Sequence, residues 1–226
     1  MGATHKVISY QLAAAASTGI ATSQSGTAAT PLTLNGSLVT GGVATLDSGG
    51  AARRVIITSA GNDTGITFTI VGTDRYGRPQ TEVLTGGHNT VNGGIVQTLH
   101  DFLTVTSETP SGNTASTVTS GTSAVGSSAP WVVDQWSNPG NYGCGIVCSS
   151  GTTYNVEGAY DYLAPQWDVN VNTPTYYTAL DGSAGGNTNA SPLNGPYTLL
   201  RLTITSGTGL VTARFIQPFN AGATAL

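Results

Sequence analysis

The sequence has very few charged side chains. Asp, Glu, Lys and Arg make up 8% of its 226 residues, against about 25% in a typical soluble domain. Lys6 is the single lysine, and the formal net charge is −4. Because general acid–base catalysis needs positioned ionisable groups, this scarcity argues against an enzyme. A surface with few long charged side chains also loses little entropy when it is ordered at a contact.

Basic clusters and long apolar runs are also lacking. Arg53 and Arg54 form the only adjacent basic pair, whereas phosphate binding needs a basic patch or stripe. No stretch approaches the roughly 18 apolar residues of a membrane helix, and residues 1–16 lack the apolar core of a signal peptide. We therefore expect neither nucleic acid nor a membrane as a partner, and a soluble chain made inside the cell.

Cysteine is scarce, with Cys144 and Cys148 in a Cys-Gly-Ile-Val-Cys pattern. A structural zinc site normally has four ligands, and no second pair of cysteines is present. If the segment is a strand, both side chains share one face but lie about 13 Å apart, too far for a disulfide. We expect buried free thiols that pack as small hydrophobic groups.

Motifs of known active sites are absent as well. His5, His88 and His100 belong to no metal-ligand pair at useful spacing. His88 sits in a turn-like Gly-Gly-His-Asn segment, which indicates a solvated loop histidine. No Gly-x-Ser-x-Gly turn and no phosphate-binding glycine loop followed by lysine occurs. We expect no catalytic, cofactor-binding or metal-binding residues, and no cofactor.

One carbohydrate-related alternative stays open. Asp161 and Asp168 flank Trp167, and glycosidases use two facing carboxylates with aromatic side chains nearby. The sequence does not place these carboxylates face to face. A non-catalytic sugar-binding surface around Trp167 and the neighbouring Tyr176 and Tyr177 is the stronger form of this alternative.

The clearest structural signal lies between Arg54 and Leu84. Residues 54–59 are rich in β-branched side chains, and residues 66–72 alternate apolar and polar side chains. Residues 60–65 and 73–79 have turn composition, and Asp74 and Gly77 fit the ends of a type I turn. With a returning strand at 80–84, the pattern predicts a three-stranded antiparallel meander.

Further strands are predicted at residues 95–99 and 102–106. Residues 107–130 consist mainly of Ser, Thr, Gly and Pro, which predicts a long loop with a weak strand around 115–119, or a linker. We place a domain or subdomain boundary near Ala129-Pro130.

The second half begins with an aromatic cluster of Trp131, Trp136 and Tyr142. Residues 143–149 and 154–162 flank Ser150-Gly151, which predicts a hairpin. The next part, residues 168–196, is rich in Asn, Thr, Gly and Pro. This composition indicates an ordered excursion or a mobile loop.

The chain closes with two strand candidates, residues 197–205 and 210–217. Here Arg201-Leu-Thr-Ile-Thr-Ser echoes Arg54-Val-Ile-Ile-Thr-Ser, and each copy precedes a glycine turn and another strand. The echo indicates two similar β units or two hairpins of the same kind, and we slightly favour the hairpins.

These patterns predict an all-β protein, an antiparallel sandwich or jelly-roll-like fold with one or two β subdomains. The predicted division is an extended N-terminal arm at residues 1–30, a first β subdomain at 31–129 and a second at 130–226. The small polar side chains of residues 1–30 bury little surface, which favours the arm.

The segment Arg54–Leu84 resembles one that is common in structural proteins of tailed-bacteriophage virions. The likeness lies in the opening Ile-Thr-Ser-Ala-Gly-Asn, the Gly-Thr-Asp turn and the Thr-Glu strand, and Arg201–Gln217 is similar to the ends of such proteins. It covers roughly this one segment, with weaker similarity in the second half. The Asn-, Gly- and Pro-rich loops at 170–196 depart from the family's pattern.

The resemblance implies a virion component that is made in the host cytoplasm, and most specifically a capsid decoration or cement protein. Its partners would be the major capsid protein and copies of itself, as a trimer or dimer. A head–tail connector or tail component is the alternative within the same class. A carbohydrate- or receptor-binding β module is the alternative from another class.

Overall fold

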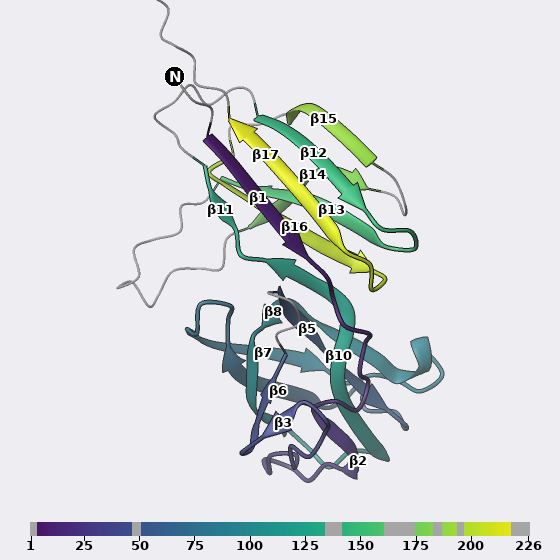
Figure 1. Ribbon diagram of the computed structural model, residues 1–226. Coiled ribbons are helices and arrows are strands. Elements are labelled where there is room, and N and C mark those ends of the chain that lie inside the picture. Colours follow the sequence, from purple (N-terminus) through teal and green to yellow (C-terminus); the bar gives the residue numbers. More distant parts are fainter. Residues whose placement is uncertain are drawn as a thin grey trace, which may run out of the picture. The chain divides into compact units, whose positions relative to one another are not determined.

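The computed structural model describes residues 4–46, 51–133, 142–160, 175–182, 187–193 and 197–217. These residues form antiparallel β-sheets and no α-helix, so the predicted all-β fold class is confirmed (Figure 1). Within the same residues, no helix has the length and apolar character needed to cross a membrane. The elements are β1 (Thr4–Tyr10), β2 (Ala21–Ser25), β3 (Val39–Thr40), β4 (Val43–Thr45), β5 (Ala51–Ser59), β6 (Thr67–Thr73), β7 (Pro79–Thr85), the 3₁₀ turn η1 (Asn92–Gly94), β8 (Ile95–Phe102), β9 (Thr104–Pro110), β10 (Thr117–Ser128), β11 (Trp131–Val132), β12 (Tyr142–Cys148), β13 (Thr153–Ala159), β14 (Tyr176–Gly182), β15 (Asn187–Leu193), β16 (Leu199–Ser206) and β17 (Val211–Gln217).

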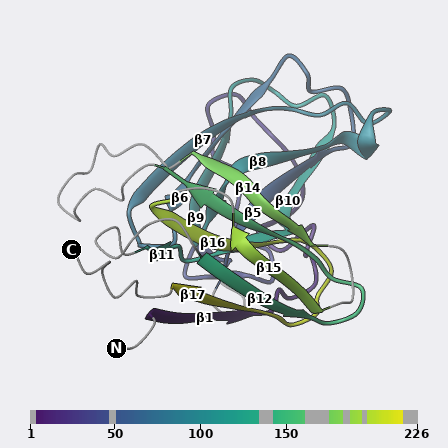
Figure 2. The same cartoon turned by 90° about the horizontal axis from the view of Figure 1, so that it is seen from above.

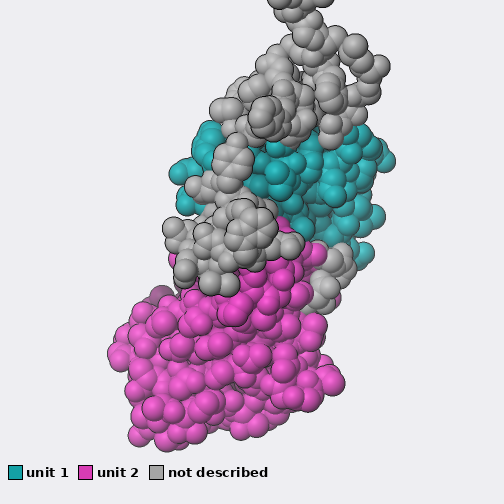
Figure 3. Space-filling view, turned by 90° about the vertical axis from the view of Figure 1, so that its left-hand side faces the viewer, with its two compact units in different colours: residues 1–12, 127–226 teal, residues 13–126 magenta. Residues whose placement is uncertain are grey.

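The chain divides into two compact units, coloured separately in Figure 3. Unit 2 is residues 13–126, and unit 1 combines residues 1–12 with residues 127–226. The division differs from the predicted one mainly at the N-terminus, where residues 1–30 are shared between the units. Main-chain pairing explains the difference, because β1 pairs with β17 and β2 pairs with β10. In addition, Ile8 and Tyr10 of β1 are buried.

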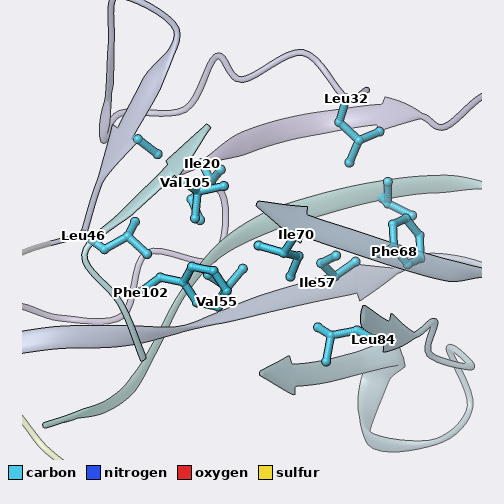
Figure 4. Close-up of a cluster of buried hydrophobic side chains, with 12 residues drawn as sticks. Ile20, Leu32, Leu46, Val55, Ile57, Phe68, Ile70, Leu84, Phe102 and Val105 are labelled. Atoms are coloured by element: carbon cyan, nitrogen blue, oxygen red, sulfur yellow. The ribbon is translucent and has the colours of Figure 1, made fainter. Parts of the chain in front are cut away.

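Unit 2 is a sandwich around one apolar core. One sheet has the strand order β3-β4-β9-β6-β7, and across from it β10, β5 and β8 lie side by side, with β2 paired to β10. Figure 4 shows side chains from both sheets meeting between them, including Val55 and Ile57 of β5 and Phe68 and Ile70 of β6. All four side chains are buried, as expected where the inner faces of two sheets pack together.

The predicted turn at Asp74–Gly77 is confirmed, and it joins β6 to β7 in an antiparallel hairpin. The Gly77 amide donates to the Asp74 carbonyl at 3.0 Å, and the Asp74 carboxylate accepts from the Tyr76 amide at 2.8 Å. Gly77 has φ +76°, a value that L side chains rarely adopt. A type I turn followed by a left-handed glycine is a common three-residue hairpin loop.

The predicted three-stranded meander is wrong in one respect. β5 does not pair with β6, because β5 lies between β10 and β8 in the opposite sheet. Its side chains are buried along almost its whole length, as in a central strand that is covered on both faces. Residues 60–66 therefore form an arch that carries the chain from one sheet across the core to the other.

The predicted loop or linker at 107–130 is also wrong. β9 extends to Pro110, and β10 is the longest of the described strands, with 12 residues. Ser120 and Thr122 of β10 are fully buried, so small hydroxyl side chains fill interior positions here. Gly121 allows close backbone packing, because a Cβ at this position would lie 1.8 Å from the carbonyl oxygen of Ala16.

Unit 1 contains a four-stranded sheet of order β1-β17-β12-β15, with β1 and β15 at its two margins (Figure 2). The second group of paired strands has the order β14-β13-β16, with β11 also paired to β16. Residues 168–196 were predicted as an excursion or loop, but β14 and β15 lie within this segment. Residues 168–174, 183–186 and 194–196 of this segment lie outside the described residues.

The predicted hairpin at 143–149 and 154–162 is wrong in the same way as the meander. The turn itself forms, with the Thr152 amide donating to the Ser149 carbonyl at 3.3 Å. However, β12 pairs with β15 and β17, whereas β13 pairs with β14 and β16. β16 and β17 are likewise successive strands in different sheets. Thus neither copy of the Arg-x-x-Ile-Thr-Ser echo begins a hairpin, and both begin an arch.

Candidate functional site

The histidines do not gather into a metal-binding group among the residues that the structure describes. Within that part of the chain, no three His, Cys, Asp or Glu side chains gather closely enough to hold a metal ion. His88 lies in a turn, where its Nδ1 is 2.8 Å from the Thr90 hydroxyl. His100 does not pair with its neighbour Asp101 but lies 3.1 Å from the Glu82 carboxylate.

Glu82 of β7 holds an irregular segment of β8. Gln97 and Asp101 of β8 pair with Ile56 and Arg54 of β5, so the residues between them form a bulge. The Glu82 carboxylate accepts from the amide of Leu99 at 2.7 Å and from that of His100 at 3.0 Å. The bulge points the Leu99 side chain outward, where it is 77% exposed.

The same contact changes the acidity of both side chains. The hydrogen bond to Glu82 raises the pKa of His100, although burial opposes this shift. Burial alone would raise the pKa of Glu82, but hydrogen bonds from His100 and from the two amides lower it. Both shifts favour the charged forms of Glu82 and His100. The Glu82 carboxylate thereby binds main-chain amides at the outer edge of β8, where another strand would otherwise pair.

The two cysteines are buried free thiols, as predicted. Cys144, Ile146 and Cys148 are buried on one face of β12, while Val147 is exposed. Burial raises the pKa of Cys144 to about 12, so this thiol stays neutral. Since only the thiolate is a good nucleophile, Cys144 has a structural role.

Each copy of the echo places its arginine in a cross-strand ion pair. Arg54 lies directly opposite Asp101 of β8, with Nε and Oδ1 3.6 Å apart. Arg201 lies directly opposite Glu157 of β13, with Nε and Oε2 2.7 Å apart. The Glu157 carboxylate also accepts from the Thr203 hydroxyl at 2.8 Å. The repeated sequence therefore produces the same contact in both units.

Aromatic side chains gather at one end of unit 1, around Tyr160, Tyr177 and Tyr197, which we call the tyrosine cluster. The ring of Tyr160 lies 5.8 Å from that of Tyr177 and 5.2 Å from that of Tyr197, measured between centroids. Tyr160 and Tyr177 are 51% and 53% exposed, whereas Tyr197 is buried. Tyr197 packs over Gly158, where a Cβ would lie 2.3 Å from the ring.

Burial and the neighbouring Tyr160 raise the pKa of Tyr197, so its phenol stays neutral. Beside the cluster, the Arg201 guanidinium lies over the ring of Tyr176, 3.6 Å from its centroid. Of the two predicted sugar-contacting tyrosines, Tyr177 is thus exposed and Tyr176 lies beneath Arg201. Sequence reasoning did not identify Tyr160 and Tyr197, although the alternation of β13 places Tyr160 in register with buried positions.

Among the other predicted aromatic positions, Trp131 lies apart from the tyrosine cluster. Trp131 is partly buried and stacks at 5.7 Å on Phe215, a core residue of β17. The remaining predicted positions lie outside the described residues: Trp136, Asp161, Trp167 and Asp168.

The margin of β1 is the second candidate contact surface. β1 pairs only with β17 among the described strands, so no described strand pairs with the main chain on its other side. Tyr10 anchors the strand, because its hydroxyl donates to the Leu202 carbonyl at 2.6 Å and accepts from the Ile204 amide at 2.9 Å. On the outer face of this sheet Val7, Val147 and Ile216 are partly exposed.

Comparisons with known proteins give no relative. No protein-family model matches the chain, and no curated protein and no solved structure matches it.

Proposed function

We propose that this chain is a structural component of a tailed-bacteriophage virion, most specifically a capsid decoration or cement protein that stabilises the shell through β-mediated contacts. The observation that carries the proposal is the margin of β1, a strand held firmly on one side by β17 and by Tyr10. Such an edge can extend a neighbouring sheet by main-chain pairing. The phage assignment itself rests on the resemblance of Arg54–Leu84.

The sparse charge of the chain supports the same proposal. A surface of short uncharged side chains is suited to being covered by neighbours, and many copies on a shell add avidity, so each contact can be modest. In this proposal the partners are the major capsid protein and copies of the chain itself, as a dimer or trimer. The chain acts without catalysis, after being made in the host cytoplasm.

Proline substitutions along β1 test the edge. In an antiparallel strand, amides point alternately toward the partner strand and away from it. Proline at His5, Lys6 and Val7 in turn therefore samples both directions, with alanine at each position as the matched control. Proline at an inward amide should destabilise unit 1, measured by thermal unfolding.

Proline at an outward amide should leave unit 1 stable but weaken binding to particles that were assembled without this chain. Binding is measured by co-sedimentation, and shell strength by heating the loaded particles. Unchanged binding for every stable proline variant would rule out β1 as the contact edge.

A head–tail connector or tail component would use the same edges in fewer copies. Copy number per particle separates this alternative from a cement protein.

The tyrosine cluster favours a second candidate function, a carbohydrate- or receptor-binding β module. Two neighbouring exposed rings can stack on a sugar or on a partner's apolar group. The variants Tyr160→Ala and Tyr177→Ala should abolish binding on a glycan array, while Tyr76→Ala, at an exposed tyrosine in unit 2, should have no effect. No bound glycan for the wild-type chain would exclude the carbohydrate form of this candidate.

A further inference from the structure

The carboxyl group of Glu108 lies inside unit 2. Glu108 is on β9, opposite Ile70 of β6, and is fully buried. Its Oε1 accepts a hydrogen bond from the Ser120 hydroxyl of β10 at 2.6 Å. Its Oε2 is buried and has no hydrogen-bond partner among the described residues. A buried polar atom without a partner is rare and needs a physical explanation.

No cation among the described residues balances this carboxyl group. Neither β2, β4, β6, β10 nor the segment at residues 31–36 has an ionisable side chain, and Glu108 is the only one on β9. The other strands of this core, β5, β7 and β8, use their ionisable groups elsewhere: Arg54 is paired with Asp101, Arg53 donates to the Ser123 carbonyl, and Glu82 is paired with His100.

A carboxylate in such a place is costly. Removing an ion from water into an apolar core without a counter-charge costs several kcal/mol, whereas a neutral carboxyl group costs much less. Accordingly, burial raises the pKa of Glu108 to about 7, although the hydrogen bond from Ser120 opposes the shift. A protonated carboxyl group can keep the contact with Ser120 as donor or acceptor.

We propose that unit 2 folds around a protonated Glu108, so that folding of this unit takes up one proton and unit 2 loosens as the pH rises from mildly acidic to neutral. In unit 1 the carboxylate of Glu157 differs from Glu108, because it faces Arg201 and Thr203. The pH dependence caused by Glu108 is therefore expected in unit 2 and not in unit 1.

The direction of the pH dependence follows from comparing the folded and unfolded states of unit 2. In the unfolded chain the carboxyl group titrates at its ordinary pKa of 4.5, and in the folded unit at a pKa of about 7. Below the lower value both states hold the proton and the stabilisation is complete. Between the two values the folding equilibrium constant should fall about tenfold per pH unit, and above the upper value the loss should be complete.

Hydrogen exchange of the full chain, followed by mass spectrometry from about pH 5 to about pH 8 and corrected for intrinsic exchange rates, tests this linkage. Peptides from β6, β9 and β10 should lose protection about tenfold per pH unit up to neutrality. Peptides from β12, β13 and β17 should keep their protection over the same pH range. Protection of the β6, β9 and β10 peptides that does not fall with pH would overturn the proposal.

Two variants identify the responsible group. Glu108→Gln keeps the shape but cannot ionise, and it should abolish the fall in unit 2 between about pH 5 and about pH 6.5. His100→Gln is the matched control, since His100 is a second side chain of unit 2 whose pKa is raised in the folded chain, and it should retain the fall below about pH 6.5. A Glu108→Gln variant with the wild-type pH dependence would overturn the proposal.

Infrared spectroscopy of the wild-type chain requires no variant and remains decisive if Glu108→Gln does not fold. Exposed carboxyl groups are ionised at about pH 6, so a protonated carboxylic acid band that persists there and disappears near neutrality is expected. A spectrum with carboxylate bands only at that pH would contradict a protonated Glu108.

Discussion

The two units repeat one local solution but differ in what they bury. Each contains an Arg-x-x-Ile-Thr-Ser segment within a strand, and its arginine pairs with a carboxylate directly across the sheet. In each unit an arch into the opposite sheet follows this segment. Unit 2 encloses Glu108 in its core. The buried groups of unit 1 include the thiols of Cys144 and Cys148, and its end carries the tyrosine cluster.

This difference shows that a shared strand motif sets the sheet contacts without setting the chemistry of the core. In unit 2 the buried carboxyl group links stability to pH. Unit 1 has the anchored edge of β1 and the exposed rings of Tyr160 and Tyr177, so we propose that contacts with partners lie on unit 1.

The largest effect is expected from truncating a core phenylalanine in either unit. Phe68 in unit 2 and Phe215 in unit 1 are both fully buried. The variants Phe68→Ala and Phe215→Ala should each lower the free energy of unfolding by about 3–5 kcal/mol. Hydrogen exchange by unit should locate each loss in the mutated unit. Equal losses in both units from one substitution would mean that the chain unfolds as a single body.

A smaller effect is expected at Gly158, which allows Tyr197 to pack against the sheet. Gly158→Ala places a Cβ 2.3 Å from the Tyr197 ring and should cost about 1–3 kcal/mol through overpacking. It should also change the tyrosine fluorescence of the cluster. The control is Gly65→Ala in unit 2, where no atom lies within 4 Å of the added Cβ. Equal costs for the two variants would refute the packing role of Gly158.

The smallest effect concerns the two ion pairs. Double-mutant cycles with Arg201→Met and Glu157→Gln should give a coupling of about 1 kcal/mol, and cycles with Arg54→Met and Asp101→Asn about 0.3 kcal/mol. The first pair is closer, at 2.7 Å against 3.6 Å, and Tyr176 holds its arginine in place. A stronger coupling for the Arg54 pair than for the Arg201 pair would contradict this prediction.

Local features of the sequence were good predictors of strands. The alternation of residues 66–72, the turn at Asp74–Gly77 and the shared face of Cys144 and Cys148 were all correct. Strand pairing was harder to predict, because a glycine turn between two strands fits an arch as well as a hairpin. Only the burial of β5 on both faces separates the two, and burial depends on the opposite sheet.

The functional features were harder to predict for the same reason. Glu82 and Glu108 look like ordinary strand residues, and their roles arise from partners on other strands, the β8 bulge and Ser120. The positions of Gln80, Glu82 and Leu84 on the inner face of β7 gave a usable signal, since a charged residue between two inward positions needs a partner. The composition of β10 gave no such signal, because serine and threonine are typical of loops.

Quantitative mass spectrometry of purified phage particles tests the central claim most directly. If the chain is a cement protein, it should be present in a copy number comparable to that of the major capsid protein, and particles that lack it should break at a lower temperature. Absence of the chain from purified particles, or its presence only as a trace, would contradict the account.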